Sequence, residues 1–147
     1  MAKTKEIKKL LTLADKYDLE GREILQKYAP VKLAKIYNGI GPDSFPAWLR
    51  YVITDLHPSL AVVALIHDVE WHESDGSKEK FTASNKRFKY NGYKVAKAEY
   101  GWYNPLRYIV MNDARRFGNL CQIFGWAAWC SPCECAVCRK TKEIKNA

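Results

Sequence analysis

Apolar residues recur at three- and four-residue intervals along most of this chain, which is the spacing of one face of an α-helix. The clearest case is the apolar run at about 59–73, for which Ser59 is a natural N-cap. A turn with the sequence SDGS follows, and a second helical pattern covers about 78–100. Because this connection is short, we expect an antiparallel pair of helices that pack against each other.

The register of this helix pair brings one polar pair together inside an apolar seam. With the turn centred near Gly76, Trp71 faces Phe81. His67 then faces Asn85 one turn further along. An imidazole that contacts a side-chain carbonyl is held in one tautomer, and its other nitrogen is left to accept a proton. This is half of a general-base site; the alternative is a core histidine and asparagine that only satisfy each other.

Helical patterns also flank this pair on both sides. One covers about 3–28, with Gly21 as a break, and a shorter one covers about 30–36. A further long helix is expected at about 105–129, because Asn104 and the proline after it suit the N-cap and N1 positions. No segment alternates apolar and polar residues over a sustained length, so the sequence predicts a mostly α fold.

Length, composition and charge indicate a single small domain with a basic surface. The chain has 147 residues, 48% of them hydrophobic, which suits a single domain at about 1–129 followed by a short tail. Its net charge of +8 suits an anionic partner such as phosphate head groups or nucleic acid. The N-terminus lacks the apolar core of a signal peptide, and no apolar run is long enough for a transmembrane helix. We therefore expect synthesis in the cytoplasm.

A glycine-rich loop precedes the helix pair. It reads YNGIG at 37–41, and Gly39 and Gly41 leave its backbone groups free to turn toward a ligand. No strand pattern precedes it, so it is a weak phosphate signature, whereas its carbonyls suit a hard cation. A short amphipathic helix is expected after the loop, at about 45–55.

The order of these motifs resembles the phospholipase A2 superfamily. YNGIG is similar to the family's calcium loop, Y-x-G-x-G, and HDVEW at 67–71 is similar to its active-site helix, H-D-x-x-Y. The family's second helix supplies an acid in a pattern like A-D-x-x-F, and the matching ASNKRF at 83–88 has Asn85 in place of that acid. The resemblance covers about 37–95 and is closest to the disulfide-free versions found in viral capsid proteins and in bacterial or phage reading frames.

The resemblance implies calcium-dependent hydrolysis of the sn-2 ester of glycerophospholipids at a membrane surface. His67 would be the general base that activates water. Calcium would be held by Asp68 and by the backbone carbonyls of Tyr37, Gly39 and Gly41, and the Gly39 N–H would help to stabilise the oxyanion. The resemblance also implies a viral or phage protein that associates with the virion or a host membrane.

Two departures from the family pattern weaken this expectation. Asn85 carries no charge, so it cannot stabilise the imidazolium that forms during general-base catalysis. We expect weakened activity unless Asp75 or Glu79, near the turn, replaces the missing acid. Trp71 stands where the family has a tyrosine, and an indole donates but does not accept a hydrogen bond. The alternative function is therefore a small basic, non-catalytic binding protein on the same scaffold, with a protein or nucleic-acid partner.

The tail at 130–147 is basic and rich in cysteine. Cys130, Cys133, Cys135 and Cys138 form a C-x-x-C-x-C-x-x-C pattern. The two pairs are closer than in a zinc ribbon, but one compact loop suits a single zinc or another soft metal. Disulfides and lipidated thiols are the competing interpretations. Cys121, by contrast, is expected to be a buried core thiol.

Overall fold

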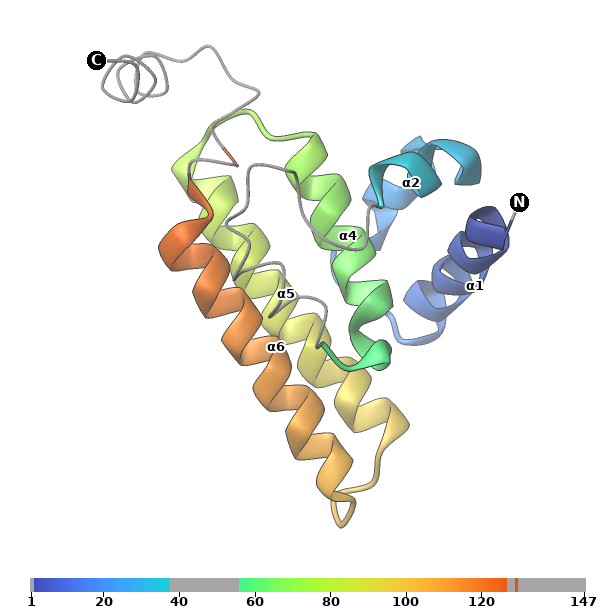
Figure 1. The fold of residues 1–147 in the computed structure, drawn as a ribbon, viewed down its shortest axis with the longest axis vertical. Coiled ribbons are helices and arrows are strands. Elements are labelled where there is room, and N and C mark those ends of the chain that lie inside the picture. Colours follow the sequence, from blue (N-terminus) through green and yellow to red (C-terminus); the bar gives the residue numbers. More distant parts are fainter. Residues whose placement is uncertain (1, 38–55, 127–128, 130–147) are drawn as a thin grey trace.

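The chain is mostly helical in the computed structural model, which describes residues 2–37, 56–126 and 129 (Figure 1). No strand occurs within these ranges, so the predicted mostly α fold class is confirmed. The predicted helix at about 45–55 lies outside them. The elements in chain order are α1 (Ala2–Lys16), the 3₁₀ helix η1 (Arg22–Lys27), α2 (Pro30–Ile36), the 3₁₀ helix η2 (Pro58–Leu60), α4 (Ala61–His72), α5 (Lys78–Glu99) and α6 (Pro105–Phe124).

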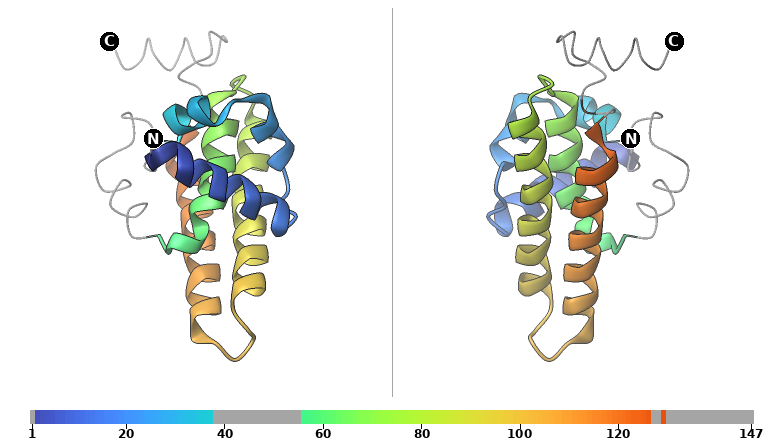
Figure 2. Two further views of the ribbon diagram at one scale, coloured as in Figure 1. Left: turned by 90° about the vertical axis from the view of Figure 1, so that its right-hand side faces the viewer. Right: turned by 90° about the vertical axis from the view of Figure 1, so that its left-hand side faces the viewer.

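The two longest helices, α5 and α6, lie side by side and form a hairpin (Figure 2). Small residues allow their backbones to approach closely, because a Cβ added to Gly92 would lie only 2.3 Å from the Cβ of Ala114. Gly118 fits in the same way, with the Asn85 carbonyl oxygen 3.0 Å from the position of its missing Cβ. The contact between these helices therefore depends on the absence of side chains at two positions.

The beginning of α6 follows the prediction and its end does not. Asn104 is the N-cap, and its Oδ1 accepts a hydrogen bond of 3.0 Å from the backbone nitrogen of Leu106. The helix ends at Phe124 rather than near 129, with Gly125 as its C-cap. A side chain on Gly125 would collide with the ring of Trp71, whose Cη2 lies 2.5 Å from the Cβ position. Glycine at this position allows α6 to end against the α4 side chain.

The α4 helix and the η2 residue before it pack against α5 at both ends of the pair, and the contact of Trp71 with Phe81 is one that the sequence predicts. The rings of Trp71 and Phe81 have centroids 5.9 Å apart. At the other end, Leu60 Cδ2 lies 3.3 Å from the Cβ position of Gly92. The turn between the helices includes Gly76 in the left-handed region, with φ of 77°. A positive φ here favours glycine, which fits the placement of the turn.

The entry to α4 differs from the prediction that Ser59 is its N-cap. The capping side chain is His57, whose Nδ1 accepts from the Ser59 backbone nitrogen at 3.2 Å, and η2 precedes the α-helix. The Ser59 hydroxyl instead donates to a carboxylate oxygen of Glu99, at the end of α5. A partner 40 residues away in the sequence therefore takes the hydroxyl that a local cap would use.

The N-terminal segment contains a break earlier than predicted. The α1 helix ends at Lys16, and both Asp18 and Gly21 adopt positive φ, at 50° and 82°. Within this turn, the backbone N–H of Glu20 donates to Asn91 Oδ1 of α5 at 2.9 Å, and the Glu20 carbonyl accepts from Asn91 Nδ2 at 2.8 Å. This pairing attaches the turn to the long hairpin.

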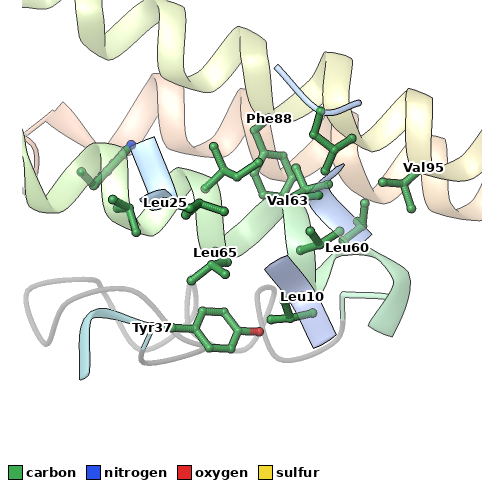
Figure 3. Packing of buried hydrophobic residues seen from close by; sticks show 14 of the residues in the cluster. Leu10, Leu25, Tyr37, Leu60, Val63, Leu65, Phe88 and Val95 are labelled. Carbon is green, nitrogen blue, oxygen red and sulfur yellow. The ribbon is translucent and has the colours of Figure 1, made fainter. Parts of the chain in front are cut away.

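The core lies between these helices and is formed by apolar residues from every α-helix of the described ranges (Figure 3). Tyr37, the last described residue before 56, is buried at one edge of it, near Leu65 and Leu10. None of the described helices combines the length and the apolar composition that crossing a bilayer requires. The largest fully buried side chains are Phe81, Phe88, Ile7, Leu19, Leu25, Leu33, Leu60, Leu65, Ile66, Val62 and Val63.

Candidate functional site

The polar centre of the helix pair is a line of four side chains that spans three helices. His67 of α4 is only 3% exposed, and its Nε2 lies 3.0 Å from Asn85 Oδ1 on α5, which is the contact that the sequence predicts. Asn85 Nδ2 donates to Gln122 Oε1 on α6 at 3.0 Å. Gln122 Nε2 in turn donates to Thr82 Oγ1 on α5 at 3.1 Å.

This line of hydrogen bonds determines which tautomer His67 adopts. The Asn85 NH₂ group is used by Gln122, and the Gln122 NH₂ group is used by Thr82. The Asn85 oxygen therefore faces the imidazole, and an amide oxygen only accepts. His67 Nε2 must carry the hydrogen, so Nδ1 is the nitrogen with a lone pair. The sequence left open whether Asn85 presents its oxygen or its NH₂ group, and in the structure the oxygen faces His67 while the NH₂ group faces Gln122.

Gln122 is a site residue that reasoning from the sequence missed. It follows the buried Cys121 on α6, so its position predicts partial burial. Nothing in the local pattern indicates that it faces Asn85, because that contact depends on how α6 is rotated against α5. The close approach of Gly118 to the Asn85 backbone sets this rotation.

Aromatic rings surround the His67 imidazole. Its ring centroid lies 5.0 Å from that of Trp71, 5.3 Å from that of Phe88 and 5.4 Å from that of Phe117. Burial among these rings lowers the pKa of His67 from 6.5 to about 4, although the hydrogen bond to Asn85 acts in the opposite direction. The imidazole is therefore neutral at pH 7 and able to accept a proton, while its protonated form is strongly disfavoured.

Asp68 follows His67 and carries the second chemically distinctive group. Burial raises the pKa of Asp68 to about 7, and no other cause contributes to this shift. Its charge also contributes, after burial, to the raised pKa of Tyr37, which is about 12. Burial and then the Asp68 charge likewise raise the pKa of the Cys121 thiol. The carboxyl group thus lies near both side chains and has no partner among the described residues that favours its ionised form.

An ionised carboxylate without a cationic partner is an oxygen ligand that a hard cation can use. A cation at Asp68 would lower the pKa of this carboxyl group and so favour its charged form. Gly39 and Gly41 lie outside the described residues, as do the four cysteines of the tail, Cys130, Cys133, Cys135 and Cys138. Within the described ranges, no group of three or more His, Cys, Asp or Glu residues is placed to hold a metal.

A second polar bridge links the same two helices. Glu70 of α4 accepts from Ser84 Oγ at 2.9 Å and forms a close ion pair with Arg87 of α5. The Arg87 Nε also lies 3.5 Å from a carboxylate oxygen of Glu20. The contacts of Glu70 with Ser84 and Arg87 join α4 to α5 independently of His67, so the register of the helix pair has two separate supports.

The acids that the sequence offered as substitutes for Asn85 do not contact His67. Asp75 accepts from the Ser77 backbone nitrogen and pairs with Lys80 at 2.9 Å, and this lysine lowers the pKa of its carboxyl group. Glu79 is exposed in the first turn of α5. His67 Nε2 is paired with Asn85, so neither acid takes the place of Asn85 beside the imidazole. The prediction of a buried Cys121 is confirmed.

No match was found when the chain was compared with protein-family models, with curated proteins and with solved structures.

Proposed function

We propose that the chain is a phospholipase A2-like protein that hydrolyses the sn-2 ester of glycerophospholipids in a calcium-dependent reaction, with His67 as general base. The observation that carries this proposal is the orientation of the imidazole. Asn85 holds the hydrogen on Nε2, which leaves the Nδ1 lone pair available, and Asp68 follows directly as an oxygen ligand.

In the proposed reaction, His67 Nδ1 takes a proton from a water molecule as the water oxygen bonds to the ester carbonyl carbon. The tetrahedral intermediate then collapses with cleavage of the bond to the glycerol oxygen. The imidazolium returns the proton to this leaving oxygen, which yields a free fatty acid and a lysophospholipid. Throughout these steps, Asn85 keeps the ring in one orientation.

Calcium would be held by Asp68 and by the backbone carbonyls of Tyr37, Gly39 and Gly41, as the resemblance implies. Bound there, it would supply charge stabilisation for the phosphate and for the oxyanion. The chemistry of Asp68 fits this role, because its carboxyl group is partly buried and has a pKa of about 7 in the absence of a cation.

In this proposal hydrolysis is slow. The reaction requires a transient imidazolium, and burial lowers the pKa of His67 to about 4. Asn85 offers an oxygen but no negative charge to offset this effect. A carboxylate at position 85 would stabilise the charged ring, so the natural side chain limits the rate.

The test is release of fatty acid from mixed phospholipid vesicles, with calcium or with a chelator. Wild type is compared with His67→Gln, which removes the base, and with His72→Gln, a matched change at an exposed position on the same helix. We expect calcium-dependent release that His67→Gln abolishes and His72→Gln preserves. Absence of hydrolysis by both wild type and Asn85→Asp, with circular dichroism showing folded protein, would overturn the proposal.

The alternative is a non-catalytic binding protein that keeps this scaffold and binds a protein or a nucleic acid. The observation that favours it is the burial of His67, which is 3% exposed among three aromatic rings. A nucleic-acid partner would use the net charge of +8 and would give binding that weakens steeply with salt. A mobility shift of DNA or RNA that disappears as salt is raised, together with silence in the vesicle assay, would favour this alternative.

A further inference from the structure

The turn between α5 and α6 projects from the body of the protein and carries two large aromatic side chains into solvent. Trp102 is 74% exposed and Tyr103 is 77% exposed. The hairpin extends past the end of α4 and away from α1 and α2, and the turn is its outermost point (Figure 1). Both further views show the same projection (Figure 2). Side chains of this size at such a tip are not part of the core.

The turn is well ordered by hydrogen bonds of its own. The Asn104 backbone nitrogen donates to the Gly101 carbonyl at 2.9 Å, and Tyr108 Oη donates to the Trp102 carbonyl at 2.7 Å. The rings of Trp102 and Tyr103 meet edge to face, with centroids 5.9 Å apart. Because these backbone carbonyls already have partners, moving the turn out of bulk water would leave fewer polar groups unsatisfied.

Apolar and basic side chains continue from the tip along the hairpin. Leu106 and Ile109, one turn apart on α6, are both exposed. Six basic residues but only two acidic ones lie between positions 89 and 116. One of the two acids, Glu99, is turned toward the body of the protein, where it accepts from Tyr17 and Ser59. Most charged side chains along this part of the hairpin are therefore basic.

We infer that Trp102 and Tyr103, which together we call the hairpin tip, insert into the head-group layer of an anionic lipid bilayer. Tryptophan and tyrosine favour this layer because one part of each ring system is apolar and another forms hydrogen bonds. Basic side chains along the hairpin would be attracted to anionic head groups. A stable protein interface needs about 800 Å² on each partner, whereas a narrow convex tip suits a fluid surface that imposes no shape.

This inference extends the proposed function, because it assigns the element that would bring the protein to a lipid surface. The tip follows the last residue of α5, whereas Asn85 lies in the first half of that helix. Because the tip and the candidate site are separate, lipid binding and hydrolysis can be measured with different variants. Calcium is not required for the contact, which depends on side chains of the hairpin alone.

The experiment is co-sedimentation of the full chain with phosphatidylcholine vesicles that do or do not contain phosphatidylglycerol, in a buffer with a chelator. The test variant is Trp102→Ser with Tyr103→Ser. The matched control is Val31→Ser with Tyr90→Ser, which removes side chains that are 58% and 51% exposed elsewhere on the surface. Thermal unfolding of each variant verifies that the fold is retained.

We expect wild type and the control to bind the phosphatidylglycerol vesicles and the tip variant to bind about tenfold more weakly or worse. Equal binding by the tip variant would overturn the inference, as would absence of binding by wild type. Self-association of wild type that the tip variant abolishes, without vesicle binding, would instead assign the tip to a contact between copies of the chain. His67→Gln should bind vesicles as wild type does. If wild type binds vesicles but neither it nor any variant hydrolyses lipid, only the proposed function is refuted and the inference about the hairpin tip stands.

Discussion

Asn85 Oδ1 lies 3.0 Å from His67 Nε2, and the same amide donates through Nδ2 to Gln122. Exchange of its oxygen and nitrogen would require Gln122 to reverse its own amide as well. The imidazole is therefore oriented by a neutral group. What the neutral group does not provide is charge.

Asn85→Asp should raise the rate of calcium-dependent hydrolysis, because a carboxylate beside the ring favours its protonated form. Gln122 can turn its NH₂ group toward the new carboxylate, since the Thr82 hydroxyl is able to donate to the Gln122 oxygen. The pKa of His67, followed by NMR titration, should rise above its value of about 4. Asn85→Ala is the control, and it should lose the orientation of the ring without gaining charge. An unchanged His67 pKa in Asn85→Asp would refute this account.

Gln122→Met should destabilise the fold by roughly 1–3 kcal/mol, because it leaves the buried Asn85 NH₂ group without an acceptor. Methionine has nearly the same length, so little volume is lost. Gln122→Glu keeps an acceptor in place and should cost less. Chemical denaturation measures all three proteins, and the idea fails if the methionine variant is as stable as wild type. The pH profile of hydrolysis should also change in Gln122→Met, since Asn85 is then able to reverse its amide.

The buried His67 should make the protein less stable in acid. The pKa of His67 is about 4 in the folded protein, whereas the ordinary value of 6.5 applies to the unfolded chain. Below pH 6.5 the unfolded chain therefore binds the proton more readily than the folded protein. Stability linked to this group therefore falls as the pH drops from about 6.5 to about 4, by about 3 kcal/mol in total. Denaturant unfolding across this range tests it, with His67→Gln as the variant in which this dependence should disappear.

Asp68 should have the opposite pH dependence. Its pKa is about 7 in the fold against a reference of 3.8, so the folded protein binds the proton more readily between these values. Stability linked to Asp68 is present below pH 3.8 and is lost as the pH rises through about 7. Asp68→Asn should therefore be more stable than wild type at pH 8 without calcium, and the difference should vanish near pH 4.

Calcium provides a further measurement on the same pair of proteins. If Asp68 is a ligand, calcium should raise the midpoint of thermal unfolding of wild type at pH 8 and should have little effect on Asp68→Asn. The effect on wild type should shrink at pH 5, where the carboxyl group is protonated. A calcium response of equal size in both proteins would show that the ion binds elsewhere.

Gly92→Ala should destabilise the protein even though alanine favours helix formation by about 1 kcal/mol. The added Cβ would lie 2.3 Å from the Ala114 Cβ, so α5 and α6 must separate at their closest contact. Ala114→Gly in the same chain removes the clash and should restore part of the loss. If Gly92→Ala and the double variant unfold at the same denaturant concentration, the loss of stability does not come from a clash between positions 92 and 114.

The helix pair shows why part of the site is predictable. The 3.6-residue period and the short turn at Gly76 leave little freedom in the register of α4 against α5. The sequence therefore places Trp71 against Phe81 and His67 against Asn85, and both contacts are present. The second of these pairs is the centre of the candidate site.

The parts of the site that escaped prediction depend on contacts between segments distant in the sequence. Gln122 reaches Asn85 only because α6 is rotated to place Gly118 against the α5 backbone. Ser59 has the right chemistry for an N-cap, but Glu99 takes its hydroxyl. A local pattern carries no information about either partner, since each comes from an element whose position is set by packing.

The pairing of Asn91 with residue 20 restricts the choice of amino acid at position 91 but hardly at position 20. Asn91 contacts the N–H and the carbonyl of residue 20, not its side chain. Almost any amino acid except proline offers those two groups, so position 20 is free to change without affecting the attachment. Position 91 has no such freedom, because only a side-chain amide of this length both donates and accepts there. Among sequences that share this fold, the turn after α1 is therefore able to diverge while the residue that holds it stays asparagine.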